Sequence, residues 1–200
     1  MSISEELQAL ALISGKGISK IFDDIYGDIL TYRYSSESEF ISKMWDRYEA
    51  NSVSMNGAVF EGLLATILFR SGILPLFVQA KLSFVPNVDF DFVAYSKEFG
   101  PVILSAKTSL RERYKQADLE GMMLRQVHRK SKSYLITLNE KEAASVNQKI
   151  EKGLVLGLDK VVVATDKAFN NLIEDLKLLN FYRPDKIDVL TSSRMITNQS

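Results

Sequence analysis

Two aspartates and a lysine stand in neighbouring apolar segments of the chain. Asp89 and Asp91 alternate with apolar residues in VPNVDFDFVAY, and Lys107 ends the apolar segment VILSAK. A period of two is typical of a strand, so both aspartates are predicted to share one face. The opposite face would carry Val88, Phe90, Phe92 and Ala94. Carboxylate oxygens suit Mg²⁺, and a nearby ammonium group can orient a water molecule, but the exposed face of an edge strand would show the same pattern.

A third carboxylate, Glu61, lies within an apolar helical pattern. Its neighbours include Phe60, Leu63 and Leu64. A carboxylate among apolar residues is costly unless it is paired, hydrogen-bonded or bound to a metal. Glu61, Asp89, Asp91 and Lys107 are therefore the candidate catalytic residues, provided that one helix and one hairpin bring them together.

A basic segment follows Lys107. Residues 107–132 contain eight basic and three acidic residues, although the whole chain carries 25 of each and has no formal net charge. We expect this segment to hold a phosphodiester backbone beside the lysine. The predicted contacts are Ser105, Thr108, Ser109, Arg111, Arg113, Lys115 and Gln116. The alternative is the solvated start of an amphipathic helix.

The elements that must position these residues are predicted from periodicity and turn residues. Helices are expected at 2–13, 18–32, 37–50, 55–70, about 111–130, 140–156 and 167–179, and strands at 76–84, 88–95, 102–107, 133–138, 160–166 and 187–191. The order indicates one α/β domain over residues 1–200. It divides into a helical N-terminal region (1–53), a core (54–166) and a C-terminal helix and strand (167–200).

Composition excludes several kinds of site. There is no cysteine and one histidine, so thiolate catalysis and cysteine-rich zinc sites are excluded. The longest apolar run, residues 62–69, is far shorter than a membrane helix, and the N-terminus carries acids where a secretory signal would carry positive charge. Ser14–Gly17 lacks the spacing of a phosphate-binding loop. We therefore expect an intracellular protein with no membrane partner and no nucleotide cofactor.

The order of elements resembles a known nuclease core. A helix, a three-strand antiparallel meander with an aspartate on its second strand and a lysine ending its third, a helix and a strand resemble the PD-(D/E)XK nucleases over about residues 57–166. SAKTSLRERYKQADLE and YLITLNEKEAASVNQKI resemble type II restriction endonucleases of that superfamily. The resemblance implies a restriction-endonuclease-like core, a prokaryotic cytoplasmic location, and Mg²⁺-dependent hydrolysis of double-stranded DNA. A homodimer is expected because a palindromic duplex presents two antiparallel scissile bonds.

Two positions depart from the family pattern. Asn87-Val88 precede Asp89 where the family has a proline, and Ser105 replaces the acid two residues before the lysine. Either the site is inactive or another acid has taken over, and Glu61 is the candidate because some members of the superfamily take a carboxylate from that helix. The Mg²⁺ ligands would then be Glu61, Asp91 or Asp89, and the carbonyl of Ala106.

Two questions stay open at this point. The acid-then-apolar pattern favours Asp91 as the principal ligand but leaves Asp89 possible. A structure-specific repair or junction nuclease, or an inactive DNA-binding module, would share the same core.

Overall fold

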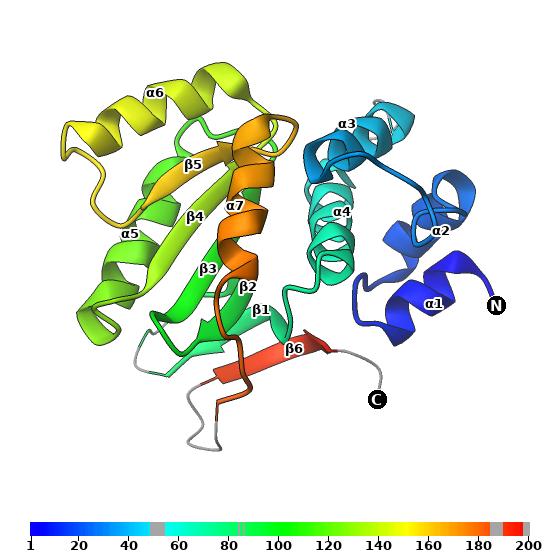
Figure 1. The fold of residues 1–200 in the computed structure, drawn as a ribbon, viewed down its shortest axis with the longest axis horizontal. Helices are drawn as coiled ribbons and strands as arrows, with labels where there is room; N and C mark the ends of the chain where they lie inside the picture. Colours follow the sequence, from blue (N-terminus) through cyan, green and yellow to red (C-terminus); the bar gives the residue numbers. More distant parts are fainter. Residues whose placement is uncertain (49–54, 84, 86, 185–189, 198–200) are drawn as a thin grey trace.

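A six-stranded mixed sheet forms the centre of the described structure (Figure 1). The computed structural model describes residues 1–200 except 49–54, 84, 86, 185–189 and 198–200. The strands are β1 (Leu76–Leu82), β2 (Phe90–Ser96), β3 (Gly100–Lys107), β4 (Lys132–Thr137), β5 (Lys160–Val163) and β6 (Leu190–Ile196). Their order across the sheet is β5-β4-β3-β2-β1-β6.

The pairing of the strands confirms the predicted meander. β1, β2 and β3 are antiparallel neighbours, whereas β4 pairs parallel to β3 and β5 parallel to β4. A parallel pair needs a long crossover, and α5 (Arg113–Val127) supplies it between β3 and β4. β6 pairs antiparallel to β1 and extends the sheet at that edge. The predicted mixed α/β sheet flanked by helices is therefore confirmed.

Helices cover both faces of this sheet (Figure 1). The remaining helices are α1 (Ile3–Ala9), α2 (Lys16–Ile25), α3 (Glu37–Tyr48), α4 (Asn56–Arg70), α6 (Glu140–Glu151) and α7 (Lys167–Lys177). The face covered by α4 and α7 is called the α4 side here, and the face covered by α5 and α6 the α5 side. The largest core cluster joins the α4 side to the N-terminal helices, and two smaller clusters fill the α5 side.

Some boundaries differ from the prediction. α2 begins at Lys16, because Gly15 takes a φ of 96° at the N-cap, and it ends at Ile25 instead of Tyr32. β5 ends at Val163, because Asp166 accepts a hydrogen bond from the amide of Lys167 and begins α7. The last strand was predicted at 187–191 but begins at Leu190, and residues 187–189 lie outside the described residues.

The predicted faces of β2 were wrong. Val88 and Phe90 pack on the α5 side, whereas Phe92 and Ala94 pack on the α4 side. The alternation is interrupted at residue 91. The neighbouring β1 is irregular at the same level, where Gln79 has a φ of 49° between the pairs Val78–Phe92 and Ala80–Phe90. A strict period of two therefore does not describe the strand that carries the aspartates.

The helices found in the described residues include none long and apolar enough to cross a membrane.

Candidate active site

Asp91 and Lys107 form the centre of the candidate active site. The Nζ of Lys107 donates a hydrogen bond to Oδ2 of Asp91 over 2.7 Å, and the backbone N–H of Ala106 donates to the same oxygen over 2.7 Å. The pairing of β2 with β3 ends at Phe92–Leu104, so the amide of Ala106 is left for the Asp91 side chain. The Asp91 side chain is 10% exposed and that of Lys107 is 21% exposed. The prediction that one hairpin brings an aspartate to the strand-end lysine is confirmed by this contact.

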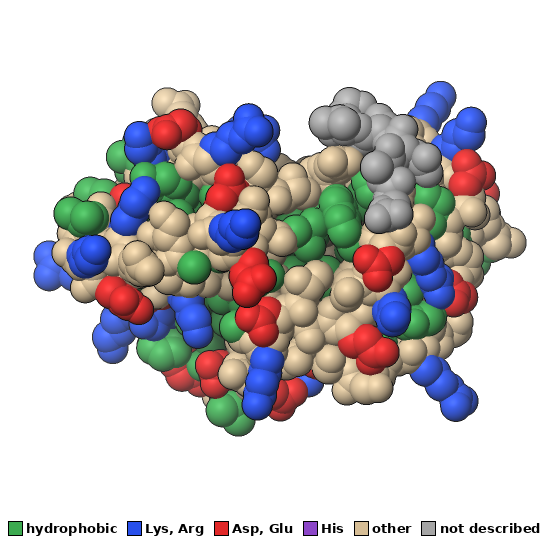
Figure 2. Space-filling model, turned by 90° about the horizontal axis from the view of Figure 1, so that it is seen from above, with side chains coloured by type: hydrophobic (Ala, Val, Ile, Leu, Met, Phe, Trp, Pro, Cys, Tyr) green, Lys and Arg blue, Asp and Glu red, His purple; other side chains and the backbone are tan. Residues whose placement is uncertain are grey.

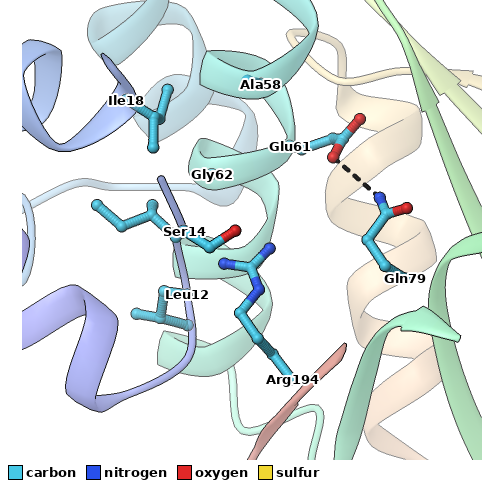
Figure 3. A pocket seen from close by; sticks show the side chains of 9 residues that line it. Leu12, Ser14, Ile18, Ala58, Glu61, Gly62, Gln79 and Arg194 are labelled. Carbon is cyan, nitrogen blue, oxygen red and sulfur yellow. Dashed lines mark hydrogen bonds between the residues drawn. The ribbon is translucent and has the colours of Figure 1, made fainter. Parts of the chain in front are cut away.

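Glu61 approaches this pair from α4. Its Oε2 accepts a hydrogen bond of 3.2 Å from the side-chain amide of Gln79 (Figure 3). Burial, and next the charge of Asp91, raises the pKa of Glu61 to about 7, while the charges of Lys107 and Arg194 act in the opposite direction. The carboxylate expected from the helix is therefore close enough to interact electrostatically with Asp91 and Lys107.

A carboxylate that the sequence did not single out, Glu120, approaches from α5. Its Oε1 accepts a hydrogen bond of 2.7 Å from the side-chain amide of Gln116. Burial raises its pKa, as do the charges of Asp91 and Asp89, whereas the amide of Gln116 and the charge of Lys107 lower it. Asp91 and Lys107 therefore interact electrostatically with Glu120 as well as with Glu61.

Glu120 approaches from the side of the sheet on which an acid at position 105, replaced here by Ser105, would project. Ile103 packs on the α5 side, while Leu104 and Ala106 pack on the α4 side. By alternation, Ser105 and Lys107 project toward the α5 side. An acid at position 105 would lie there, which is the side from which Glu120 comes. The sequence signal that could have led to Glu120 was Ser105, because the loss of an acid there requires a substitute carboxylate on this side of β3.

Asp89 lies apart from the pair. It precedes β2, its side chain is 55% exposed, and its Oδ1 lies 3.5 Å from the Nζ of Lys81, which is also exposed. Its charge still affects the pKa of Glu120. The structure thus brings together Glu61, Asp91 and Lys107 of the predicted catalytic residues, adds Glu120, and places Asp89 at the margin.

The donor set suits a hard cation. In the described residues, no group of three or more His, Cys, Asp or Glu side chains is positioned around one metal ion. However, both bonds to Asp91 end on Oδ2, so its other oxygen is available, and the proximity of Asp91 raises the pKa of Glu61. A divalent cation would offset this repulsion between half-buried carboxylates, and all the donors are oxygens, as Mg²⁺ prefers.

The predicted DNA-contacting residues differ in exposure. Arg111, Arg113, Lys115 and Gln116 are exposed at the start of α5, and Lys115 forms an ion pair with Glu112. Thr108 and Ser109 are half-buried and line a cavity of about 530 Å³ beside Trp45. Ser105 is buried at 7% exposure, so the predicted DNA contact by its side chain has no open surface in this structure.

Charges of both signs are interspersed on the one face of the molecule that is seen in Figure 2. The face in Figure 2 carries acidic and basic side chains side by side, with apolar patches between them. This arrangement agrees with the zero formal net charge of the chain. A contact with a polyanion must therefore depend on a local group of cations such as the start of α5.

No protein-family model matches the sequence, and no curated protein matches it significantly. Among solved structures, the chain is similar to the restriction endonuclease PspGI in complex with its substrate DNA, with 16% identity, a TM-score of 0.47, and coverage of 92% of this chain and 82% of that one.

Proposed function

We propose that the protein is a Mg²⁺-dependent endonuclease that hydrolyses phosphodiester bonds of double-stranded DNA at a specific short sequence. The observation that carries this proposal is the Asp91–Lys107 ion pair where the pairing of β2 with β3 ends, flanked by Glu61 from α4 and Glu120 from α5. Half-buried carboxylates gathered around one lysine are costly for stability. Their presence therefore points to a functional site.

Lys107 has the central chemical role in this proposal. Its ammonium group orients the attacking water and stabilises the negative charge that develops on the phosphate. Asp91 holds Lys107 in place through the 2.7 Å contact. Asp91, Glu61, Glu120 and the carbonyl of Ala106 are the groups that would hold a Mg²⁺ ion, which would supply Lewis-acid stabilisation of that charge. Glu120 supplies a carboxylate on the side of Ser105, so the serine does not by itself argue for an inactive protein.

The start of α5 has the substrate-binding role. Arg113, Lys115 and Gln116 are exposed in the first turn of the helix that also carries Glu120, and Arg111 is exposed just before it. Thr108 and Ser109 connect this group to Lys107. Phosphate contacts of this kind fix the register of the duplex, while base contacts add the sequence choice. We further propose that two copies act together as a homodimer, because a palindromic duplex presents two equivalent scissile bonds.

Incubation of the protein with plasmid DNA tests the proposal. With Mg²⁺ we expect discrete fragments, and with EDTA we expect intact plasmid. Cleavage at branched or damaged sites alone would favour a structure-specific repair nuclease. Binding without cleavage at any Mg²⁺ concentration would favour an inactive DNA-binding module, and sedimentation of the DNA-bound protein would show whether two copies bind one duplex.

A further inference from the structure

Arg194 projects from β6 into a cavity beside the candidate active site. The cavity has a volume of about 220 Å³ and is bounded by α4, β1, β6 and the segment that connects α1 to α2. Its polar lining residues are Ser14, Glu61, Gln79 and Arg194, and the others are apolar residues or glycine. Glu61 therefore belongs both to the candidate active site and to the wall of this cavity (Figure 3).

Two nitrogen atoms of the Arg194 guanidinium group have no acceptor within the described residues. Its Nε and Nη1 atoms are buried and have no hydrogen-bond partner in the part of the chain that the structure describes. Burial lowers the pKa of Arg194, whereas the charge of Glu61 raises it. An arginine side chain stays protonated in proteins, so a buried guanidinium without a partner is costly. A group from outside the chain that supplied an acceptor would remove this cost.

Glu61 is the obvious internal partner, but its carboxylate is directed elsewhere. It accepts its hydrogen bond from Gln79 on β1, and in Figure 3 it points toward that strand and away from the guanidinium. No ion pair joins Arg194 to an acid within the described residues. The described residues thus supply no acceptor for Nε and Nη1 of this cation.

The position of Arg194 in the sheet relates it to the candidate active site. Arg194 pairs with Val78 in the register of β6 and β1, one residue from Gln79, which lies across from Asp91. Lys107, Asp91, Gln79 and Arg194 therefore lie on the four successive strands β3, β2, β1 and β6. Three strand spacings amount to about 14 Å. That distance corresponds to about four nucleotides along a duplex axis, at about 3.4 Å for each nucleotide of one strand.

We propose that the Arg194 cavity is a binding site for a phosphate oxyanion, filled by a non-scissile phosphate of the DNA substrate. This inference rests on the proposed function for the source of the phosphate. The planar guanidinium would donate through its unsatisfied N–H groups, and Ser14 and Gln79 would supply further donors. Glu61 is the one acid among the lining residues, and coordination of Mg²⁺ by Glu61 would offset its repulsion of the anion.

Duplex binding by charge-removing and charge-retaining variants tests the inference. Arg194→Gln and Arg194→Lys are compared in the Lys107→Ala background with Mg²⁺, and the exposed Arg183→Gln is the matched control. We expect Arg194→Gln to weaken binding about tenfold and to lower the slope of log K against log salt by about one unit. Arg194→Lys should keep most of the slope, and Arg183→Gln should leave both values unchanged.

A second measurement separates DNA phosphate from free phosphate and from a structural role. The thermal unfolding of the ligand-free variants is followed with and without inorganic phosphate at constant ionic strength. Arg194→Gln should lower the Tm of the ligand-free protein little, because Nε and Nη1 have no hydrogen bond to lose within the described residues and only the attraction to Glu61 is removed. If it leaves duplex binding unchanged but abolishes stabilisation by inorganic phosphate, the oxyanion site is supported and its ligand is a free phosphate.

Two results would overturn the inference. One is wild-type behaviour of Arg194→Gln in both the duplex and the phosphate measurements. The other is a lower Tm without any change in ligand binding, which would make Arg194 a structural residue. If the parent protein fails to bind duplex DNA at all, the proposed function fails, and the phosphate measurement still decides whether the cavity binds an oxyanion.

Discussion

Replacement of Glu61 by glutamine should change the pH dependence of stability. Burial and the charge of Asp91 raise the pKa of Glu61 to about 7 in the folded protein, from an ordinary value of 4.5. Between these pH values the folded protein keeps a proton that the unfolded chain has lost. The free energy of unfolding therefore falls as the pH rises above 4.5, and it levels off above about 7. Each pKa unit corresponds to about 1.4 kcal/mol, so the complete loss is about 3 kcal/mol.

Urea denaturation between pH 5 and pH 8 measures this effect. The wild type should lose about 2 to 3 kcal/mol over that range through Glu61. The decline in the free energy of unfolding should be smaller in Glu61→Gln by the contribution of Glu61, because glutamine does not titrate. The exposed Glu140→Gln serves as the control and should keep the wild-type decline. Mg²⁺ should reduce the decline in the wild type and in Glu140→Gln but not in Glu61→Gln, since binding favours the ionised carboxylate of Glu61. Equal pH profiles for wild type and Glu61→Gln would refute the reasoning, because Glu61 would then behave as an exposed acid.

Three further changes test separate parts of the structure. Lys107→Ala should slow single-turnover cleavage by more than about 100-fold, or more than about 2.7 kcal/mol, while the affinity measured by gel shift stays within about tenfold of the wild type. The exposed control Lys81→Ala should cut at the wild-type rate, and rapid cleavage by Lys107→Ala would contradict the role proposed for this lysine. Arg111→Ala, Arg113→Ala and Lys115→Ala should each lower the salt slope of duplex binding by about one unit, whereas wild-type slopes would make this segment a solvated helix face. Gly157→Ala should lower the free energy of unfolding by about 1 to 3 kcal/mol or more, because its Cβ would lie 1.9 Å from the carbonyl oxygen of Asp118 on α5. The control Gly57→Ala should not lower the free energy of unfolding, because its Cβ would meet no atom within 4 Å.

The meander and its central ion pair could be predicted from local patterns. Apolar runs separated by turn residues indicated β1, β2 and β3, and an antiparallel meander necessarily brings Asp91 near the end of the strand that carries Lys107. Glu61 was recognisable because an acid among Phe60, Leu63 and Leu64 needs a partner. These inferences depend on neighbours in sequence and on simple pairing, which is why they needed no tertiary information.

The parts that were missed depend on tertiary geometry. Glu120 is flanked by Leu119 and Gly121, and this local context did not indicate that its carboxylate would approach Asp91 and Lys107. Burial raises its pKa because α5 packs against the sheet. The reversal of faces at Asp91 follows the φ of 49° at Gln79, a conformation that a glutamine rarely adopts. Arg194 lies beyond the predicted end of the last strand, and its cavity forms between segments far apart in the chain.

The most direct test of the central claim is Mg²⁺-dependent cleavage of plasmid DNA by matched carboxylate variants. Asp91→Asn, Glu61→Gln and Glu120→Gln keep the approximate shape of each side chain and remove its charge, and Glu140→Gln is the exposed control. We predict that the wild type and Glu140→Gln cut with Mg²⁺ and that each of the other three variants is at least about 100-fold slower, or about 2.7 kcal/mol. Cleavage by Asp91→Asn at the wild-type rate, or no cleavage by the wild type with Mg²⁺, would contradict the account.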